Sequence, residues 1–267
     1  YLLTIPGMGE NAALTGDLDV TEDLTINGAG RFLTTIDAGG LDRVLQIGVV
    51  NILLGPTILT QITGVTIKGG DSGSGVGSGI NVYTNSSLTL TNTRVTNNAP
   101  YAGIYAVFSS AHSISIMDSR IDNNAGGGIM LASADATTTI VNSVIDANFN
   151  NNNGGGIVNY GTLNVVNTTI SGNSTIYNGG GIYNAGTTGL FNVTISNNTA
   201  NSDGNIDGDG GGISGVITGR NSIIAGNFDD NGTGFLYDDC SGSFVSEGHN
   251  LIENPIGCTI TGDSTGN

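Results

Sequence analysis

The amino-acid sequence predicts an all-β fold: a single-domain parallel β-helix solenoid of about ten coils. Three observations support this prediction: a composition that disfavours helices, two markers that recur about every 25 residues, and short alternating strands between the markers. One coil cannot bury its own inner face, but coils stacked about 4.8 Å apart share a continuous core and satisfy the backbone. We expect one domain over residues 1–267, with clear repeats in 60–255.

The composition excludes several classes of protein. The 267 residues include 45 Gly, abundant Asn, 4 Pro and no Trp, and Gly and Asn are poor helix formers. Ile, Leu, Val and Phe together exceed the roughly 20% typical of disordered chains, so a core can form. The net charge of −16 argues against binding to nucleic acid or to an anionic membrane surface. No apolar run reaches about 18 residues, so we expect no membrane insertion.

Two independent markers define the repeat. The first is a Gly-Ile pair, with the isoleucine at Ile80, Ile104, Ile129, Ile157, Ile182 and Ile213. The second is a β-branched residue in a short apolar strand, at Ile67, Val95, Ile121, Ile145, Ile170, Ile195, Ile224 and Ile252. Both markers keep a period near 25, which is too short for a propeller blade and fits one turn of a parallel β-helix.

Asparagines stand at fixed offsets from the second marker. Three positions before it are Asn92, Asp118, Asn142, Asn167, Asn192 and Asn221, and three positions after it are Asn98, Asn124, Asn148, Asn173, Asn198 and Asn227. Asn tolerates a left-handed backbone and caps turns through its amide. We therefore predict two structural ladders at the corners of the coil, in which stacked amides bond to one another.

One outer face departs from the polar pattern expected of a solvent-exposed strand. The outward positions beside the Gly-Ile strands include Tyr83, Tyr105, Met130, Val158, Tyr160 and Tyr183, which we call the tyrosine stripe. An exposed apolar and aromatic patch generally marks an interaction surface. Stacking on sugars and packing against a neighbouring subunit are the two functional interpretations, and a loop folded over the sheet is the structural one.

Cys240 and Cys258 are the only two cysteines and do not form a zinc or redox motif. We expect them to form one disulfide in an exported protein, closing the C-terminal end over residues 238–260. A loop of this size would stabilise the fold by roughly 3 kcal/mol. The alternative is a pair of buried thiols.

The repeats GGGIVNYGTLNVVNTTISGN, from Gly154, and GGGIYNAGTTGLFNVTISNN, from Gly179, invite a family comparison, as do LTINGAG, from Leu24, and SEGHNLIENPIGC, ending at Cys258. The sequence resembles bacterial right-handed parallel β-helix surface proteins of the pectin-lyase-like superfamily, of the polymorphic-outer-membrane-protein or adhesin type. This resemblance implies a right-handed coil. It leaves the function open, because the superfamily includes lyases, hydrolases, adhesins and fibre proteins.

The enzymes of this superfamily use Asp clusters, often with calcium, and a Lys or Arg acting on the sugar carboxylate. Asp122 and Asp146 fall on adjacent coils, about 5 Å apart, and Arg94 and Arg120 stack in the same way. If the protein is an enzyme, these four residues are the candidates. The alternative is a set of solvated side chains in which Asp118 and Asp122 neutralise the two arginines. His112 and His249 are expected to be surface or turn residues.

A metal site is predicted in the segment DGNIDGDGG, which places Asp203, Asn205, Asp207 and Asp209 at alternate positions. This pattern matches the first half of an EF-hand-type calcium loop, with Gly208 in sixth place. Ser214 stands where that loop would have a bidentate Glu. Calcium is the only cofactor we expect, and an acidic loop without metal is the alternative.

The favoured function is a non-enzymatic extracellular rod, secreted or at the cell surface, acting as an adhesin segment or a fibre subunit. Tyr1 enters a strand without an obvious cap, so the expected partners include other copies of the chain, end to end or side by side. Cell-surface carbohydrate is the other expected partner. Two alternatives remain: a polysaccharide lyase or glycoside hydrolase acting on acidic polysaccharide, and a carbohydrate-binding module that uses the tyrosine stripe.

Overall fold

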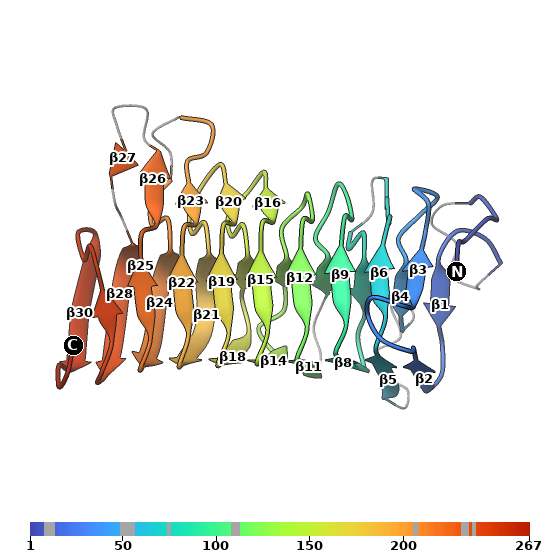
Figure 1. Ribbon diagram of the computed structural model, residues 1–267, viewed down its shortest axis with the longest axis horizontal. Helices are drawn as coiled ribbons and strands as arrows, with labels where there is room; N and C mark the ends of the chain where they lie inside the picture. The colour runs from blue at the N-terminus through green and yellow to red at the C-terminus, as the bar shows by residue number, and fades with distance from the viewer. Residues whose placement is uncertain are drawn as a thin grey trace.

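The computed structural model is an elongated β-solenoid with the two chain ends at opposite ends of the long axis (Figure 1). It describes residues 1–7, 14–48, 57–73, 76–107, 113–204, 208–230, 235–236 and 239–267. Strands, turns and bends account for the regular structure of these residues, and none of them lies in an α-helix. The described part of the chain has no helix that is long and apolar enough to cross a membrane.

The second sequence marker forms a nine-stranded parallel sheet with one strand per coil. Its strands are β3 (Thr35–Asp37), β6 (Thr66–Lys68), β9 (Arg94–Thr96), β12 (Arg120–Asp122), β15 (Val144–Asp146), β19 (Thr169–Ser171), β22 (Thr194–Ser196), β25 (Ile223–Ala225) and β29 (Leu251–Ile252). Nine stacked strands enclose about eight full turns, slightly fewer than the ten predicted. The difference arises because several coils are longer than 25 residues: Ile36 and Ile67, which are partners in adjacent strands, are 31 residues apart.

A sixteen-stranded sheet forms two further faces of the coil, which merge at β21 (Ile182–Phe191). The first face contains β1 (Leu18–Val20), β4 (Leu45–Ile47), β7 (Ile80–Val82), β10 (Ile104–Ala106), β13 (Ile129–Leu131) and β17 (Ile157–Asn159). The second contains β2 (Leu24–Asn27), β5 (Ile58–Thr63), β8 (Ser86–Thr91), β11 (Ser113–Met117), β14 (Thr137–Val141) and β18 (Thr162–Val166). After β21, β24 (Ile213–Arg220), β28 (Cys240–Glu247) and β30 (Cys258–Asp263) extend the merged sheet.

A smaller five-stranded sheet projects from the C-terminal half of the solenoid (Figure 1). It contains β16 (Phe149–Asn150), β20 (Ser174–Thr175), β23 (Thr199–Ala200), β26 (Phe228–Asp230) and β27 (Phe235–Leu236). Among the named strands of the described chain, the β26–β27 pair is the antiparallel one.

The core is a set of apolar columns that run along the solenoid axis. Ile67, Val95, Ile121, Ile145, Ile170, Ile195 and Ile224 stack in register, and none of them is exposed to solvent. The isoleucines of the Gly-Ile pairs form a second buried column, which Cys240 continues after Ile213. The predicted Cys240–Cys258 disulfide is present and joins β28 to β30.

The ladder three positions after the marker is buried and continuous. Each side-chain Nδ2 from Asn98 to Asn198 donates to the Oδ1 of the asparagine one coil further on, at 2.9 Å. The same Oδ1 also accepts the main-chain N–H of the preceding ladder residue, at 3.0–3.2 Å. The predicted inner ladder is therefore confirmed, and we call it the inner asparagine ladder.

The ladder three positions before the marker lies on the surface. All six of its residues have positive φ, between 47° and 55°, a conformation that Asn and Asp adopt more readily than other non-glycine residues. The side-chain bonds between neighbouring coils join Asp118, Asn142, Asn167 and Asn192 at 3.0–3.3 Å. At this corner the positive φ of the turn mainly determines that the residue is Asn or Asp. The hydrogen bonds between stacked side chains contribute further stability.

A third ladder, made of hydroxyl groups, lies one residue after this turn. Ser119, Ser143, Thr168 and Ser222 each accept a main-chain N–H from the coil before and donate to the carbonyl two residues earlier. Val193 is buried at the equivalent position and interrupts the ladder, because it has no oxygen to accept the N–H of Thr168.

Replacing Asn148 by Ala should destabilise the fold strongly. The change deprives the main-chain N–H and the Nδ2 of Asn124, and the carbonyl of Ile121, of partners inside the core. The expected loss is about 3 kcal/mol or more of unfolding free energy, measured by chemical denaturation. Asn142→Gly is the control: it removes an exposed amide and keeps the positive φ, so it should cost less than about 1 kcal/mol. Equal losses would contradict the inner asparagine ladder as the main support.

Replacing Val193 by Thr should stabilise the protein by about 1 kcal/mol. The new hydroxyl can accept from Thr168 N–H and donate to the carbonyl of Phe191, as its equivalents do one coil away. Val165→Thr is the matched control, because Val165 lies between Ile140 and Leu190 in an apolar column. A hydroxyl buried there should cost about 1–3 kcal/mol. The two denaturation midpoints should therefore move in opposite directions from wild type.

Candidate functional site

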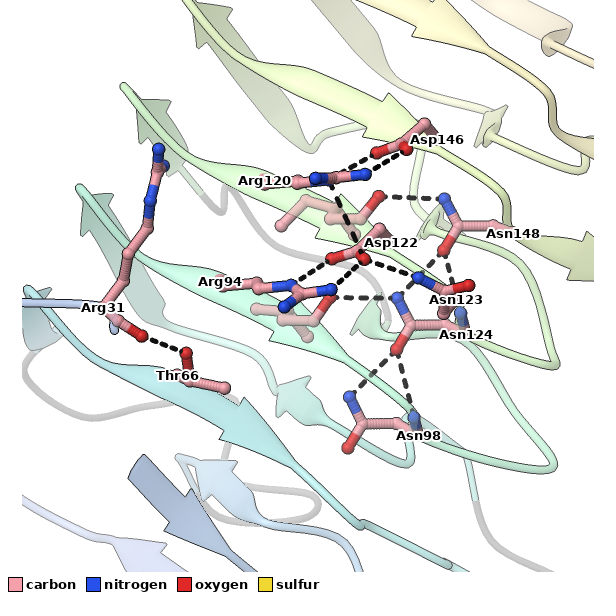
Figure 2. A network of polar contacts seen from close by, with 12 residues as sticks. Arg31, Thr66, Arg94, Asn98, Arg120, Asp122, Asn123, Asn124, Asp146 and Asn148 are labelled. Atoms are coloured by element: carbon pink, nitrogen blue, oxygen red, sulfur yellow. Dashed lines mark hydrogen bonds and ion pairs between the residues drawn. The ribbon is translucent and has the colours of Figure 1, made fainter. Parts of the chain in front are cut away.

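The four candidate catalytic residues lie together on the outer face of the nine-stranded sheet (Figure 2). Arg94 and Arg120 are in-register partners at the start of β9 and β12, and Asp122 and Asp146 are partners at the end of β12 and β15. The side chains alternate across the strand, so both pairs point outward. The predicted stacking of the two arginines and of the two aspartates is therefore present.

Each arginine is paired with the aspartate one coil further on. The Nε and Nη2 of Arg94 donate to the two carboxylate oxygens of Asp122 at 2.7 and 2.5 Å. Arg120 binds Asp146 in the same bidentate way, at 2.8 and 2.5 Å, and its Nε also lies 3.8 Å from Asp122. These hydrogen bonds raise the pKa of both guanidinium groups above the ordinary value. Two fork-shaped ion pairs thus bridge three adjacent coils.

Asp122 is fully enclosed by this network. Its side chain has no exposed surface, whereas that of Asp146 is 17% exposed. Asn123 donates a further hydrogen bond to Asp122 Oδ2, which also accepts from Arg94 Nη2, while Oδ1 accepts from Arg94 Nε. A nucleophile or general base must reach the substrate, and in this arrangement Asp122 is covered by Arg94 and Asn123.

The prediction that Asp118 neutralises one of the two arginines is wrong. Its carboxylate accepts instead from the Nδ2 of Asn142, at 3.3 Å, and its main-chain oxygen accepts from Arg31. The cause is geometric: Asp118 lies in the turn before β12, whereas Asp122 and Asp146 lie on the strands that the arginine side chains cross. His249 is exposed in a positive-φ turn, and His112 lies outside the described residues.

Another carboxyl group, Asp17, has a perturbed pKa that the sequence did not signal. Burial raises its pKa to about 7, although the nearby Arg43, whose Nε lies 2.8 Å from Asp17 Oδ2, acts in the opposite direction. Asp17 borders a cavity of about 230 Å³ lined by Leu3, Ile5 and Leu14 among others. The walls of this cavity are mostly apolar. Neither Asp122 nor Asp146, the predicted catalytic carboxylates, lines it.

The tyrosine stripe occupies the outer side of the first face of the sixteen-stranded sheet. Tyr105, Met130, Val158 and Tyr183 are successive partners in register along β10, β13, β17 and β21. The rings of Tyr160 and Tyr183 meet edge to face, with centroids 6.3 Å apart. Burial raises the pKa of Tyr105, and the nearby Tyr160 and Tyr83 raise it further. The sequence therefore located a real cluster of four tyrosines.

Val158 differs from the rest of the stripe. It points outward as predicted but is only 2% exposed. The glycine-rich turn before β17 packs against it, and a β-carbon at Gly154 would lie 2.5 Å from Val158 Cγ2. Val158 is therefore not itself a contact surface.

The predicted calcium loop is described only in part. Asn205 and Asp207 lie outside the described residues, while Asp203 and Asp209 are exposed. The main-chain N–H of Asp209 donates to the Oδ1 of Asn178, which fixes the end of the loop to the coil below. Across the described ranges, no three His, Cys, Asp or Glu side chains are grouped closely enough to hold a metal ion. The calcium site stays a prediction from the sequence.

Comparison with known proteins places this geometry in a fold class. The family model described as "Right handed beta helix region" matches residues 55–145, which confirms the predicted right-handed parallel β-helix. No curated protein matches the sequence. The crystal structure of pectate lyase Pel9A is similar, with a TM-score of 0.47 and 12% sequence identity, over 87% of this chain and 70% of that chain.

If the Asp203–Asp209 loop binds calcium, the ion should stabilise the folded protein by mass action. At a calcium concentration 100 times the Kd, the gain is about 2.7 kcal/mol, which raises the melting temperature. The measurement is a melting curve with 5 mM CaCl2 and with EDTA, for wild type and for Asp203→Asn/Asp209→Asn. A melting temperature that does not respond to EDTA would remove the site from consideration.

Proposed function

We propose that this protein is a non-enzymatic, extracellular β-helical rod, acting as an adhesive segment or a fibre subunit at a cell surface. The observation that carries the proposal is the state of the two candidate carboxylates. Asp122 and Asp146 are each held by an arginine fork, and Asp122 is inaccessible to solvent. To make either carboxylate available to a substrate, its ion pair with arginine would have to break. This would leave a negative charge that the arginine now neutralises.

The construction of the solenoid also favours a structural role. Three ladders and two fork-shaped ion pairs join neighbouring coils through the middle of the solenoid, so outward side chains there keep constant spacing along the axis. The Cys240–Cys258 disulfide is compatible with an oxidising, extracellular compartment. Such a rod presents long rows of side chains to a partner. The partners we propose are other copies of the chain, end to end or side by side, or cell-surface carbohydrate.

The test is an assay of chain cleavage on polygalacturonate and alginate, read both as unsaturated product absorbance and as new reducing ends. We expect no activity above buffer from wild type, with or without calcium. The variant Asp122→Asn/Asp146→Asn should also give the buffer value. Cleavage by wild type that is abolished in this variant would establish the lyase or hydrolase alternative and refute the proposed function.

A further inference from the structure

The residues of the tyrosine stripe belong to two parallel columns of side chains on the outer side of the sheet. The first is set by strand register and contains Asn81, Tyr105, Met130, Val158 and Tyr183. The second lies two residues further along each strand and contains Tyr83, Val107, Ala132, Tyr160 and Ala185; main-chain hydrogen bonds from Tyr83, Val107, Ala132 and Tyr160 to the preceding coil continue the register. Asn81, Val107 and Val158 are buried in these columns. The accessible surface over the five consecutive coils is formed by Tyr83, Tyr105, Met130, Ala132, Tyr160, Tyr183 and Ala185.

Aromatic rings dominate the accessible part of this surface. Tyr160 is 44% exposed and packs against Tyr183, while Tyr83, Tyr105 and Tyr183 are half-buried. Rings that are partly fixed by neighbours lose little conformational freedom when a ligand stacks on them. Each tyrosine also has a hydroxyl group that can donate or accept a hydrogen bond. The surface therefore offers flat apolar faces edged by hydroxyl groups.

The stripe carries no charge, although the protein has a net charge of −16. None of the ten side chains in the two columns is acidic or basic. A polyanion would gain no cation here and would be repelled by the rest of the molecule. A neutral ligand avoids both costs.

The dimensions of the stripe favour a chain-like ligand over a protein. Five coils span about 20 Å along the axis, and two alternate residues span about 7 Å across it. The resulting area, about 140 Å², is far below the roughly 800 Å² per partner of a stable protein interface. The narrow shape fits an extended polymer that lies along the rod.

We propose that the tyrosine stripe binds a linear, neutral polysaccharide, with the sugar rings stacked on Tyr160 and its neighbours along the solenoid axis. The inference rests on the proposed function as a surface rod and supplies the chemistry of its carbohydrate partner. The apolar C–H faces of the sugars lie on the tyrosine rings, and the sugar hydroxyls bond to the tyrosine hydroxyls. Binding requires no cleavage of the polymer.

The experiment measures mobility in native gels containing hydroxyethylcellulose, xyloglucan, galactomannan or laminarin, with polygalacturonate as the acidic control. We expect wild type to be retarded by at least one neutral polymer and not by polygalacturonate. Because the protein has no Trp, its intrinsic fluorescence comes from tyrosine, and titration with the retarding polymer should change it. Tyr160→Ala should weaken binding by about tenfold or more, whereas Tyr160→Phe should retain most of it.

Tyr177→Ala is the matched control, because Tyr177 is 38% exposed, follows β20 of the projecting sheet and is not part of the stripe. It should bind like wild type. Circular dichroism checks that every variant is folded. Failure of all four neutral polymers to retard wild type, or equal retardation of Tyr160→Ala and wild type, overturns the inference. Neither result bears on the cleavage assay, so the inference can fail while the proposed non-enzymatic rod stands.

Discussion

The inner asparagine ladder is the interaction on which the rest of the structure depends. Parallel strands supply hydrogen bonds along the sheets, but at each corner the backbone turns away and leaves N–H and C=O groups inside the protein. The ladder satisfies them: Asn124 Nδ2, for example, donates both to Asn148 and to the carbonyl of Val95. The coils from Asn98 to Asn227 repeat this arrangement, so loss of one asparagine from the ladder would leave several buried polar groups unpaired.

The ladder also has a direction and a defined end. In the bonds between ladder side chains each Nδ2 donates to the next residue toward the C-terminus, and the last one, of Asn227, donates to the carboxylate of Asp239 at 2.8 Å. A carboxylate suits the end of the ladder, because it accepts hydrogen bonds and has no N–H that would need a further partner. The second oxygen of Asp239 accepts the main-chain N–H of Asn254. Burial raises the pKa of Asp239, while these hydrogen bonds act in the opposite direction. At the other end of the ladder, the Oδ1 of Asn98 accepts a hydrogen bond from the main-chain N–H of Gly70.

Much of this fold could be predicted because the repeat appears in the sequence itself. Residues at the same offset, such as Asn148 and Asn173, must stack if the coil length is constant, so the ladders and the tyrosine columns followed from spacing alone. Spacing cannot reveal diagonal contacts between columns. Arg94 pairs with Asp122, which lies two positions further along the strand and one coil on. In the same way Arg120 pairs with Asp146, and not with Asp118 as the spacing had suggested. Nor could spacing show that the turn at Gly154 covers Val158.

The diagonal pairing places both stacked carboxylates of this solenoid in ion pairs. Asp122 and Asp146 are held side by side by strand register, so their charges repel at a distance of about 5 Å. An enzyme can use such repulsion to keep one proton on the pair at neutral pH. Here Arg94 and Arg120 remove the repulsion by supplying one cation to each carboxylate, in a geometry that uses both oxygens. The same register that places the aspartates together also places the arginines within reach, and the result is a brace between coils in which an arginine occupies both oxygens of each carboxylate.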